Sequence, residues 1–222
     1  MSIYYLPMQI KLPLMLLILL AISTACSKPE PPTINLYRAV HIGDINQVER
    51  NLNWDSNVNQ PGQDGLTALH VAAHKGSLVM VKMLLQHGAD KEVLNKQGHT
   101  PLATALLARN TLVADYLVKQ QANIDPDALL RQTVLLGQAD RDVIDFLTKQ
   151  GAALDNPDAE GNTALHLAII NGRRVIAKYL VQKGADIDLA DSSGRTPLQV
   201  AIELNQKDIE QMLRKFGAIT SP

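Results

Sequence analysis

Two histidines, His70 and His74, lie four residues apart in the stretch "GLTALHVAAHKG" (residues 65–76) and could share a metal ion. Residues four apart on a helix lie on one face, and neutral imidazole nitrogens are common zinc ligands. No third ligand stands at a recognisable spacing from them. A metal-dependent hydrolase that uses His70 and His74 is therefore one hypothesis for this chain.

The same stretch returns as "GNTALHLAIING" (residues 161–172), in which His166 matches His70 but Ile170 matches His74. A histidine that recurs without its companion favours a building block used twice over a metal site used twice. The sequence also contains no phosphate-binding glycine loop, nucleophile elbow or paired-carboxylate motif. We therefore predict that the protein is not an enzyme and needs no metal or cofactor.

Composition and charge exclude other classes of protein. The 222 residues are 46% hydrophobic, which is enough for a globular core, and 21 Lys and Arg are interspersed with 22 Asp and Glu. A nucleic-acid partner would call for a strong basic patch, and a net charge of −1 gives no sign of one. Cys26 is the only cysteine, so no internal disulfide is possible and packing alone must hold the fold.

Residues 1–25 have the organisation of a signal peptide. An apolar run at residues 12–22 follows Lys11, and small residues precede Cys26. As a helix, this run would span about 16 Å, roughly half of the hydrocarbon core, which is short for a stable transmembrane helix. Residues 26–35 are rich in proline and predict an extended, flexible tether.

Small residues directly before a lone cysteine resemble the lipobox of bacterial lipoproteins. The resemblance implies that lipid is attached to the sulfur of Cys26, which becomes the mature N-terminus. Ser27 after the cysteine, in place of Asp, implies transport to the outer membrane of a Gram-negative cell, facing the periplasm. Two alternatives stay open: ordinary signal cleavage, which leaves a free thiol in a soluble periplasmic or secreted protein, and an uncleaved anchor.

A period of about 33 residues organises the rest of the chain. Gly65 and Gly98 are one period apart, as are Gly161 and Gly194, whereas Gly98 and Gly161 are almost two periods apart. A second marker shares this register, because the Gly-Ala pairs that begin at residues 88, 151, 184 and 217 show the same long interval followed by two regular ones. The long middle interval leaves room for one irregular repeat.

The repeated stretches, including "GHTPLATAL" and "GRTPLQVAI", resemble the ankyrin repeat. The resemblance implies an all-α solenoid of helix–turn–helix units with hairpin-like loops over residues 36–219, followed by a short tail at 220–222. We expect six units, of which the first and fourth are degenerate. The first covers residues 36–59, and the others open near Gly65, Gly98, Asp127, Gly161 and Gly194.

Recurring residue types explain the repeat without any chemistry. Threonines at 67, 100, 163 and 196 can cap a helix, with proline following at 101 and 197. Alanines let helices approach closely, leucines fill the space between units, and glycines end the second helices. The ankyrin resemblance further implies that His70 and His166 hold adjoining loops together through side-chain hydrogen bonds. We expect His41, His87 and His99 to be solvated.

Unit four departs from the pattern. It lacks the Gly-x-Thr loop, and it has two extra residues between its helices when Gly137 is matched to Gly172. Asp125 and Pro126 can start its first helix after a short connection, so we expect a missing or stunted loop before Leu129. This departure is either ordinary drift or a notch that admits a protruding loop of a partner.

The resemblance also implies that loop tips and the inner face of the first helices form a concave strip that binds a protein partner of unknown identity. On the first helices, Leu107, Leu135 and Ile170 either pack under their neighbours or form an exposed apolar patch with a polar rim. The candidate binding residues are Gln63, Asp64, Leu66, His74, Lys96, Gln97, His99, Leu107, Leu135, Glu160, Asn162, Ile170, Ser192 and Arg195.

The sequence thus predicts an exported, lipid-anchored ankyrin protein, monomeric, that binds an envelope protein and inhibits, neutralises or stabilises it. A metal-dependent hydrolase and a cytosolic ankyrin interaction protein are the alternatives.

Overall fold

The structure is a computed structural model that describes residues 30–54 and 56–219. The predicted signal peptide and Cys26 lie outside the described residues, as does the tail at 220–222. Within the described ranges the regular elements are all helices, and none of them is both long and apolar enough to cross a membrane. The helices are α2 (Leu36–Ile42), α3 (Ile45–Asn53), α4 (Ala68–His74), α5 (Leu78–Gln86), α6 (Pro101–Leu107), α7 (Thr111–Lys119), α8 (Pro126–Leu135), α9 (Arg141–Lys149), α10 (Ala164–Ile170), α11 (Arg174–Gln182), α12 (Pro197–Glu203) and α13 (Lys207–Lys215).

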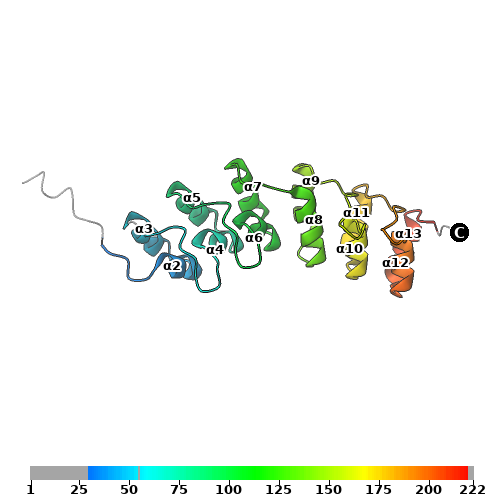
Figure 1. The fold of residues 1–222 in the computed structure, drawn as a ribbon, viewed down its shortest axis with the longest axis horizontal. Coiled ribbons are helices and arrows are strands. Elements are labelled where there is room, and N and C mark those ends of the chain that lie inside the picture. The colour runs from blue at the N-terminus through cyan, green and yellow to red at the C-terminus, as the bar shows by residue number, and fades with distance from the viewer. Residues whose placement is uncertain (1–29, 55, 220–222) are drawn as a thin grey trace, which may run out of the picture.

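Consecutive helices pair into six units that stack into an elongated array (Figure 1). Unit one is α2–α3, and each later unit adds one pair in chain order, ending with α12–α13. Long loops of equal length connect units one to two, two to three, four to five and five to six. We call these loops fingers two, three, five and six, after the unit that follows them: residues 54–67, 87–100, 150–163 and 183–196.

Local capping fixes where the short first helices begin. Thr67, Thr100, Thr163 and Thr196 are the N-caps of α4, α6, α10 and α12, as predicted. Each hydroxyl accepts a hydrogen bond from the backbone N–H three residues later, which satisfies one of the free donors of the first turn. Pro101 and Pro197 stand at the first helical position, where no backbone donor is needed.

The core runs through the array as layers of small and large side chains. The predicted alanines 72, 105, 168 and 201 are fully buried, as are the predicted leucines 84, 117, 147, 180 and 213. Alanine allows close approach of the helices, and leucine fills the space between units. On α13, Glu210 and Arg214 form an ion pair. The equivalent positions of α11 in unit five are Ala177 and Val181, so the outer face of unit six is polar.

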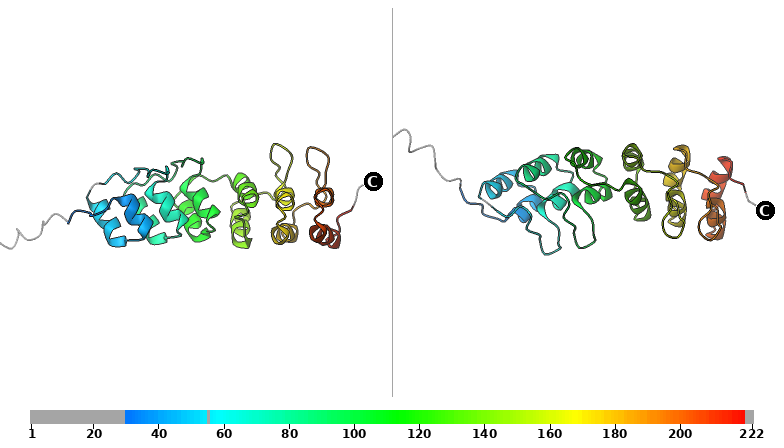
Figure 2. Two further views of the ribbon diagram at one scale, coloured as in Figure 1. Left: turned by 90° about the horizontal axis from the view of Figure 1, so that it is seen from below. Right: turned by 45° about the horizontal axis from the view of Figure 1, so that its top comes forward.

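Unit four has the irregularities that the sequence predicts. Only the short stretch 120–125 connects α7 to α8, and Asp125 caps α8 with Pro126 at its first position. Two extra residues separate the left-handed Gly137 from α9, compared with the turn at Gly172. Figure 2 shows long yellow and orange fingers beside units five and six, and only a short green link between α7 and α8.

Candidate protein-binding surface

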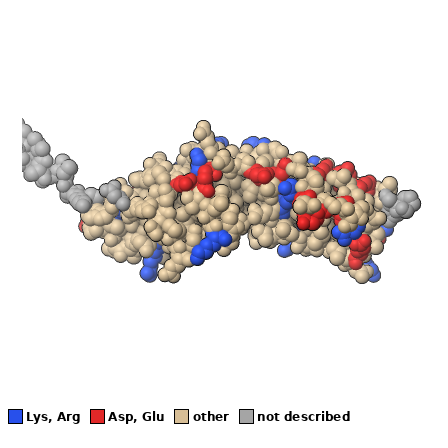
Figure 3. Space-filling model, viewed as in Figure 1, with Lys and Arg blue, Asp and Glu red and all other residues tan. Residues whose placement is uncertain are grey.

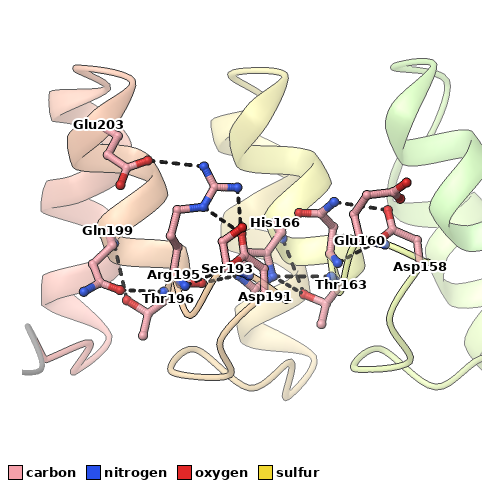
Figure 4. A network of polar contacts seen from close by, with 11 residues as sticks. Asp158, Glu160, Thr163, His166, Asp191, Ser193, Arg195, Thr196, Gln199 and Glu203 are labelled. Atoms are coloured by element: carbon pink, nitrogen blue, oxygen red, sulfur yellow. Dashed lines mark hydrogen bonds and ion pairs between the residues drawn. The ribbon is translucent and has the colours of Figure 1, made fainter.

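The two repeated histidines are structural. His70 is fully buried, and the backbone N–H of Thr67 donates to its Nδ1 at 3.2 Å. The ring therefore carries its proton on Nε2 and donates it to the carbonyl of His99 in finger three, at 3.0 Å. His166 repeats this geometry with Thr163 and with the carbonyl of Arg195 in finger six (Figure 4). Each ring thus closes a capping box and ties the next finger to the helix.

This geometry requires neutral imidazoles. Burial lowers the pKa of His70 and of His166, and the hydrogen bonds to backbone carbonyls oppose that shift only in part. Both ring nitrogens of His70 are engaged, whereas His74 is exposed. Among the described residues, no group of three His, Cys, Asp or Glu side chains is arranged to hold a metal ion. The arrangement gives no support to a shared metal at His70 and His74.

In each unit that is followed by a finger, the side chain at the His70 position reaches that finger. In unit one this position is Tyr37, whose hydroxyl donates to Asp64 in finger two. In unit four it is Arg131, which donates to the carbonyl of Asn156 in finger five at 3.1 Å. Unit three has no finger after it, and it carries Ala103 at this place.

Tyr37 was not among the candidates predicted from the sequence. It stacks on His41 with ring centroids 6.1 Å apart, and both residues line a concave pocket of about 970 Å³ beside finger two. Burial and the bond to Asp64 raise the pKa of Tyr37 to about 12. The same bond lowers the pKa of Asp64. Alignment of unit one on its buried Ala39 and Val40 would have placed Tyr37 at the histidine position.

Across the described residues, hydrogen bonds between fingers occur only within two pairs. In the first pair, Lys96 Nζ of finger three donates to the carbonyl of Gln63 in finger two at 2.7 Å. In the second pair, the backbone N–H of Ser192 in finger six donates to the carbonyl of Glu160 in finger five at 3.1 Å. Fingers two and three therefore form one pair and fingers five and six another, with the short connection of unit four between the pairs.

The second pair rests on a finger that is braced by a buried carboxylate. Asp191 accepts hydrogen bonds from the backbone of Ser193 and Arg195 and from the Arg195 guanidinium (Figure 4). Burial alone would raise the pKa of Asp191, but these bonds outweigh it and the pKa is lowered. Arg195 also reaches Glu203 on α12 at 3.3 Å. Figure 3 shows that acidic groups gather on the C-terminal half of the viewed face.

A pocket of about 450 Å³ lies beside finger three, at the missing finger. Four of its lining residues were predicted as binding candidates, and the structure brings them together: Leu66, His74, His99 and Leu107. Leu136 and Gln138, from the turn after α8, form part of its wall and were not predicted. His99 is half-buried and shares a 2.9 Å hydrogen bond with Gln132 on α8, so the prediction that His99 is solvated was wrong.

The other candidates lie at separate places along the concave side. Leu135 and Ile170 are 50% and 41% exposed, and neither lines the pocket that holds Leu107. Asn162 and Arg195 are half-buried at the bases of fingers five and six. The remaining candidates are exposed on the finger loops: Gln63, Asp64, Lys96, Gln97, Glu160 and Ser192.

Comparisons with known proteins point to one repeat family. The family model described as ankyrin repeats (3 copies) matches residues 36–128 and again residues 132–220. The chain is 30% identical over 148 residues to the transient receptor potential cation channel subfamily A member 1 homolog of Caenorhabditis elegans, covering 64% of this chain and 12% of that protein. It is 36% identical over 131 residues to NF-kappa-B inhibitor zeta of Mus musculus, covering 54% and 17%. The chain thus spans a small part of these relatives.

Solved structures match over greater lengths. A chain in the complex of the Bd0816 predatory endopeptidase from Bdellovibrio bacteriovorus with the immunity protein Bd3460 is 29% identical, with a TM-score of 0.67 over 81% of this chain and 96% of that chain. The ankyrin repeat protein EF0377 is 26% identical, with a TM-score of 0.64 and the same coverage. The human ASB11 ankyrin repeat domain, 22% identical with a TM-score of 0.70 over 84% and 85% of the chains, shares the fold.

Proposed function

This chain belongs to the ankyrin repeat family, and on that premise we propose that it is an exported protein that binds and inhibits an enzyme of the cell envelope. Ankyrin arrays are protein-interaction modules whose stacked units form an extended concave binding surface. Inhibition requires a surface that can cover an active site, and four fingers with exposed polar tips supply one.

One observation carries the choice of an enzyme as the partner. The similarity to a chain of the endopeptidase–immunity protein complex extends over 96% of that chain, so the two share the whole array and not a single repeat. An immunity protein protects its producer by neutralising an enzyme, and the same duty fits a protein that carries the predicted signal peptide. A hydrolase that would damage the producing cell's own envelope is the class of partner that we propose.

Affinity purification with an activity assay tests this function. The full chain, tagged at its C-terminus, is expressed in the cells that produce it and purified from solubilised membranes. We expect one stoichiometric partner whose hydrolytic activity falls when purified chain is added in excess. A partner with unchanged activity would instead favour a stabilising role, and the absence of a stoichiometric partner would contradict the proposal.

Export and anchoring form a second part of the proposal. The apolar run at residues 12–22 and the small residues before Cys26 support a lipid on the Cys26 sulfur, which would hold the array at the outer membrane on the tether of residues 26–35. We expect Cys26→Ser to move the protein from the membrane fraction to the soluble periplasm. Ser27→Ala is the matched control, because it leaves the sulfur in place. Unchanged membrane association of Cys26→Ser would contradict lipidation.

A further inference from the structure

The space next to finger three, on the side of unit four, is open. Gly65 and Gly161 are equivalent residues in fingers two and five, and both have left-handed backbone angles. A methyl group on Gly65 would crowd the Lys96 side chain of finger three, and one on Gly161 would overlap the backbone nitrogen of Ser192 in finger six. A methyl group on the equivalent Gly98 of finger three would meet no atom of the described chain within 4 Å. Finger three therefore has a free flank where its neighbours have a packed one.

The base of this opening is closed by the chain itself. The backbone N–H of Asn123, in the short connection, donates to Glu92 of finger three at 3.0 Å. On the other side, Asp127 of α8 accepts from the backbone N–H of Ala153 in finger five at 2.7 Å. The units are thus joined across the base, and what is absent is only the projecting part of a finger.

The floor of the opening is apolar and its walls carry hydrogen-bond donors. Leu107 and Leu136 line the pocket of about 450 Å³ together with the His74 and His99 rings, and none of the described Asp or Glu residues lines it. Beside the far wall, the half-exposed Arg109 donates to the carbonyls of Gly137 and Gln138, and Asp140 offsets part of its positive charge. The carboxylate of Asp140 lies 4.0 Å from this guanidinium.

We propose that this opening, the notch, receives a projecting loop of the partner protein, which takes the place of the missing finger between fingers three and five. The inference rests on the proposed function and names the contact that the partner makes. The loop carries an aliphatic or aromatic side chain at its tip, which enters the pocket over Leu107 and Leu136, and a carboxylate nearby, which faces Arg109.

The chain itself shows which occupant fits this place. At each of the other junctions a long finger fills the equivalent position, and the preceding unit reaches it with Tyr37, Arg131 or a histidine. Unit three instead has the buried Ala103, whose short side chain does not reach out to any finger. The notch is open along one side, so it suits a loop of finger size better than an enclosed small molecule. An apolar tip in a pocket with a charged group at the rim is the usual anchor of a protein interface.

Point variants test the notch with the partner purified as described above. Leu136→Glu places a charge on the pocket wall, and Leu136 is 50% exposed, so the fold should tolerate it. We expect the affinity for the purified partner to fall by about 30-fold or more, as for a central interface contact. Leu112→Glu is the matched control, since Leu112 is 66% exposed on α7 and does not line the pocket. Equal affinity of both variants and the wild type would overturn the inference.

A second variant fills the notch with the chain's own finger. Residues 120–128 are replaced by residues 150–163, the sequence of finger five. When Gly137 is matched to Gly172, Leu129 matches Ala164, the residue that directly follows finger five. The insertion therefore gives unit four a finger of regular length. We expect the folded variant to lose the partner, because its new finger occupies the place of the partner loop. Full binding by a folded variant would overturn the inference.

Photocrosslinking identifies the molecule that enters the notch directly. It does not require the variant with the inserted finger to fold. With p-benzoylphenylalanine at position 136 of the full chain, we expect ultraviolet light to attach one surface loop of the purified partner. Crosslinks from position 63 or 192 but not from 136 would place the partner on the finger tips and overturn the inference. A crosslink to a second copy of this chain would also overturn it. If the chain captures no partner at all, the proposed function is contradicted as well. If a partner is captured and its affinity is the same for every notch variant, only the inference about the notch is contradicted.

Discussion

The junction between units five and six and the junction between units three and four use the same core with different surfaces. In both junctions, leucines of the first helices are fully buried or nearly so, such as Leu165 and Leu198 in the first and Leu106 and Leu130 in the second. Only the junction between units five and six has a complete finger, a histidine that holds it and a tip contact to the preceding finger. The second has Ala103 and the short connection.

This difference separates two tasks that the repeat usually performs together. Burial between neighbouring units holds the array, and it continues through unit four because α8 keeps its apolar face in register. Finger contacts order the concave surface, and they are interrupted between fingers three and five. The core leucines therefore stay buried across a junction that lacks a finger, although α6 and α8 are packed less closely than α10 and α12. Matched substitutions at the two junctions test this separation.

The largest expected difference concerns two equivalent glycines. Gly161→Ala combines left-handed strain with overlap on the Ser192 backbone, so we expect the free energy of unfolding to fall by about 2–4 kcal/mol. Gly98→Ala has similar strain but open space, and we expect a loss of about 1 kcal/mol. Urea unfolding of both variants measures the difference. Equal losses would mean that the tip contact between fingers five and six contributes nothing.

A smaller difference is expected at the histidine position. His166→Ala leaves the Thr163 N–H and the Arg195 carbonyl without their partner, which should lower the free energy of unfolding by about 1–3 kcal/mol. The equivalent Gln199 of unit six accepts from the Thr196 N–H but precedes no further finger in the described chain, so Gln199→Ala should cost about 0.5 kcal/mol. Thermal unfolding of both proteins isolates the contribution of the finger. Lost partner binding by His166→Ala with an unchanged melting curve would instead assign chemistry to the ring.

A fall in pH should weaken the junctions that follow units two and five, where a buried histidine holds the next finger. Burial lowers the folded-state pKa of His70 and His166 below the ordinary value of 6.5, so the unfolded chain takes up protons first as the pH falls. The stabilisation is complete above pH 6.5 and is lost as the pH drops from there toward the folded-state pKa. We expect the melting temperature to be lower at about pH 5 than at about pH 8, and less so when both histidines are replaced by glutamine. The same acid sensitivity in the double variant would exclude these rings as its source.

The smallest effect on the free energy of unfolding is expected at the tip contact between fingers two and three. Lys96 Nζ donates to the Gln63 carbonyl between exposed residues, so Lys96→Ala should change the free energy of unfolding by about 0.5 kcal/mol or less. Urea unfolding of Lys96→Ala and of Gly161→Ala, measured under the same conditions, compares the stability of the two finger pairs. A loss as large as that of Gly161→Ala would show that both pairs are held equally firmly.

The sequence was sufficient for the features that depend on near neighbours in the chain. The repeat period, the threonine caps, the prolines at the helix starts and the buried alanines and leucines follow from local hydrogen bonding and periodic burial, and all appear in the structure. Unit four was predicted with its short connection and its two extra residues, because an absent Gly-x-Thr stretch can be read directly from the chain. His70 and His166 were assigned a structural role correctly.

Only the tertiary structure decided which side chains meet across units. Leu136 lines the pocket in place of the predicted Leu135, which depends on how α8 is placed against α6. Tyr37 replaces histidine in unit one, and His99 turns toward Gln132 instead of solvent. These contacts join residues from different units, far apart in the chain, so they depend on how the units stack and leave no local pattern in the sequence.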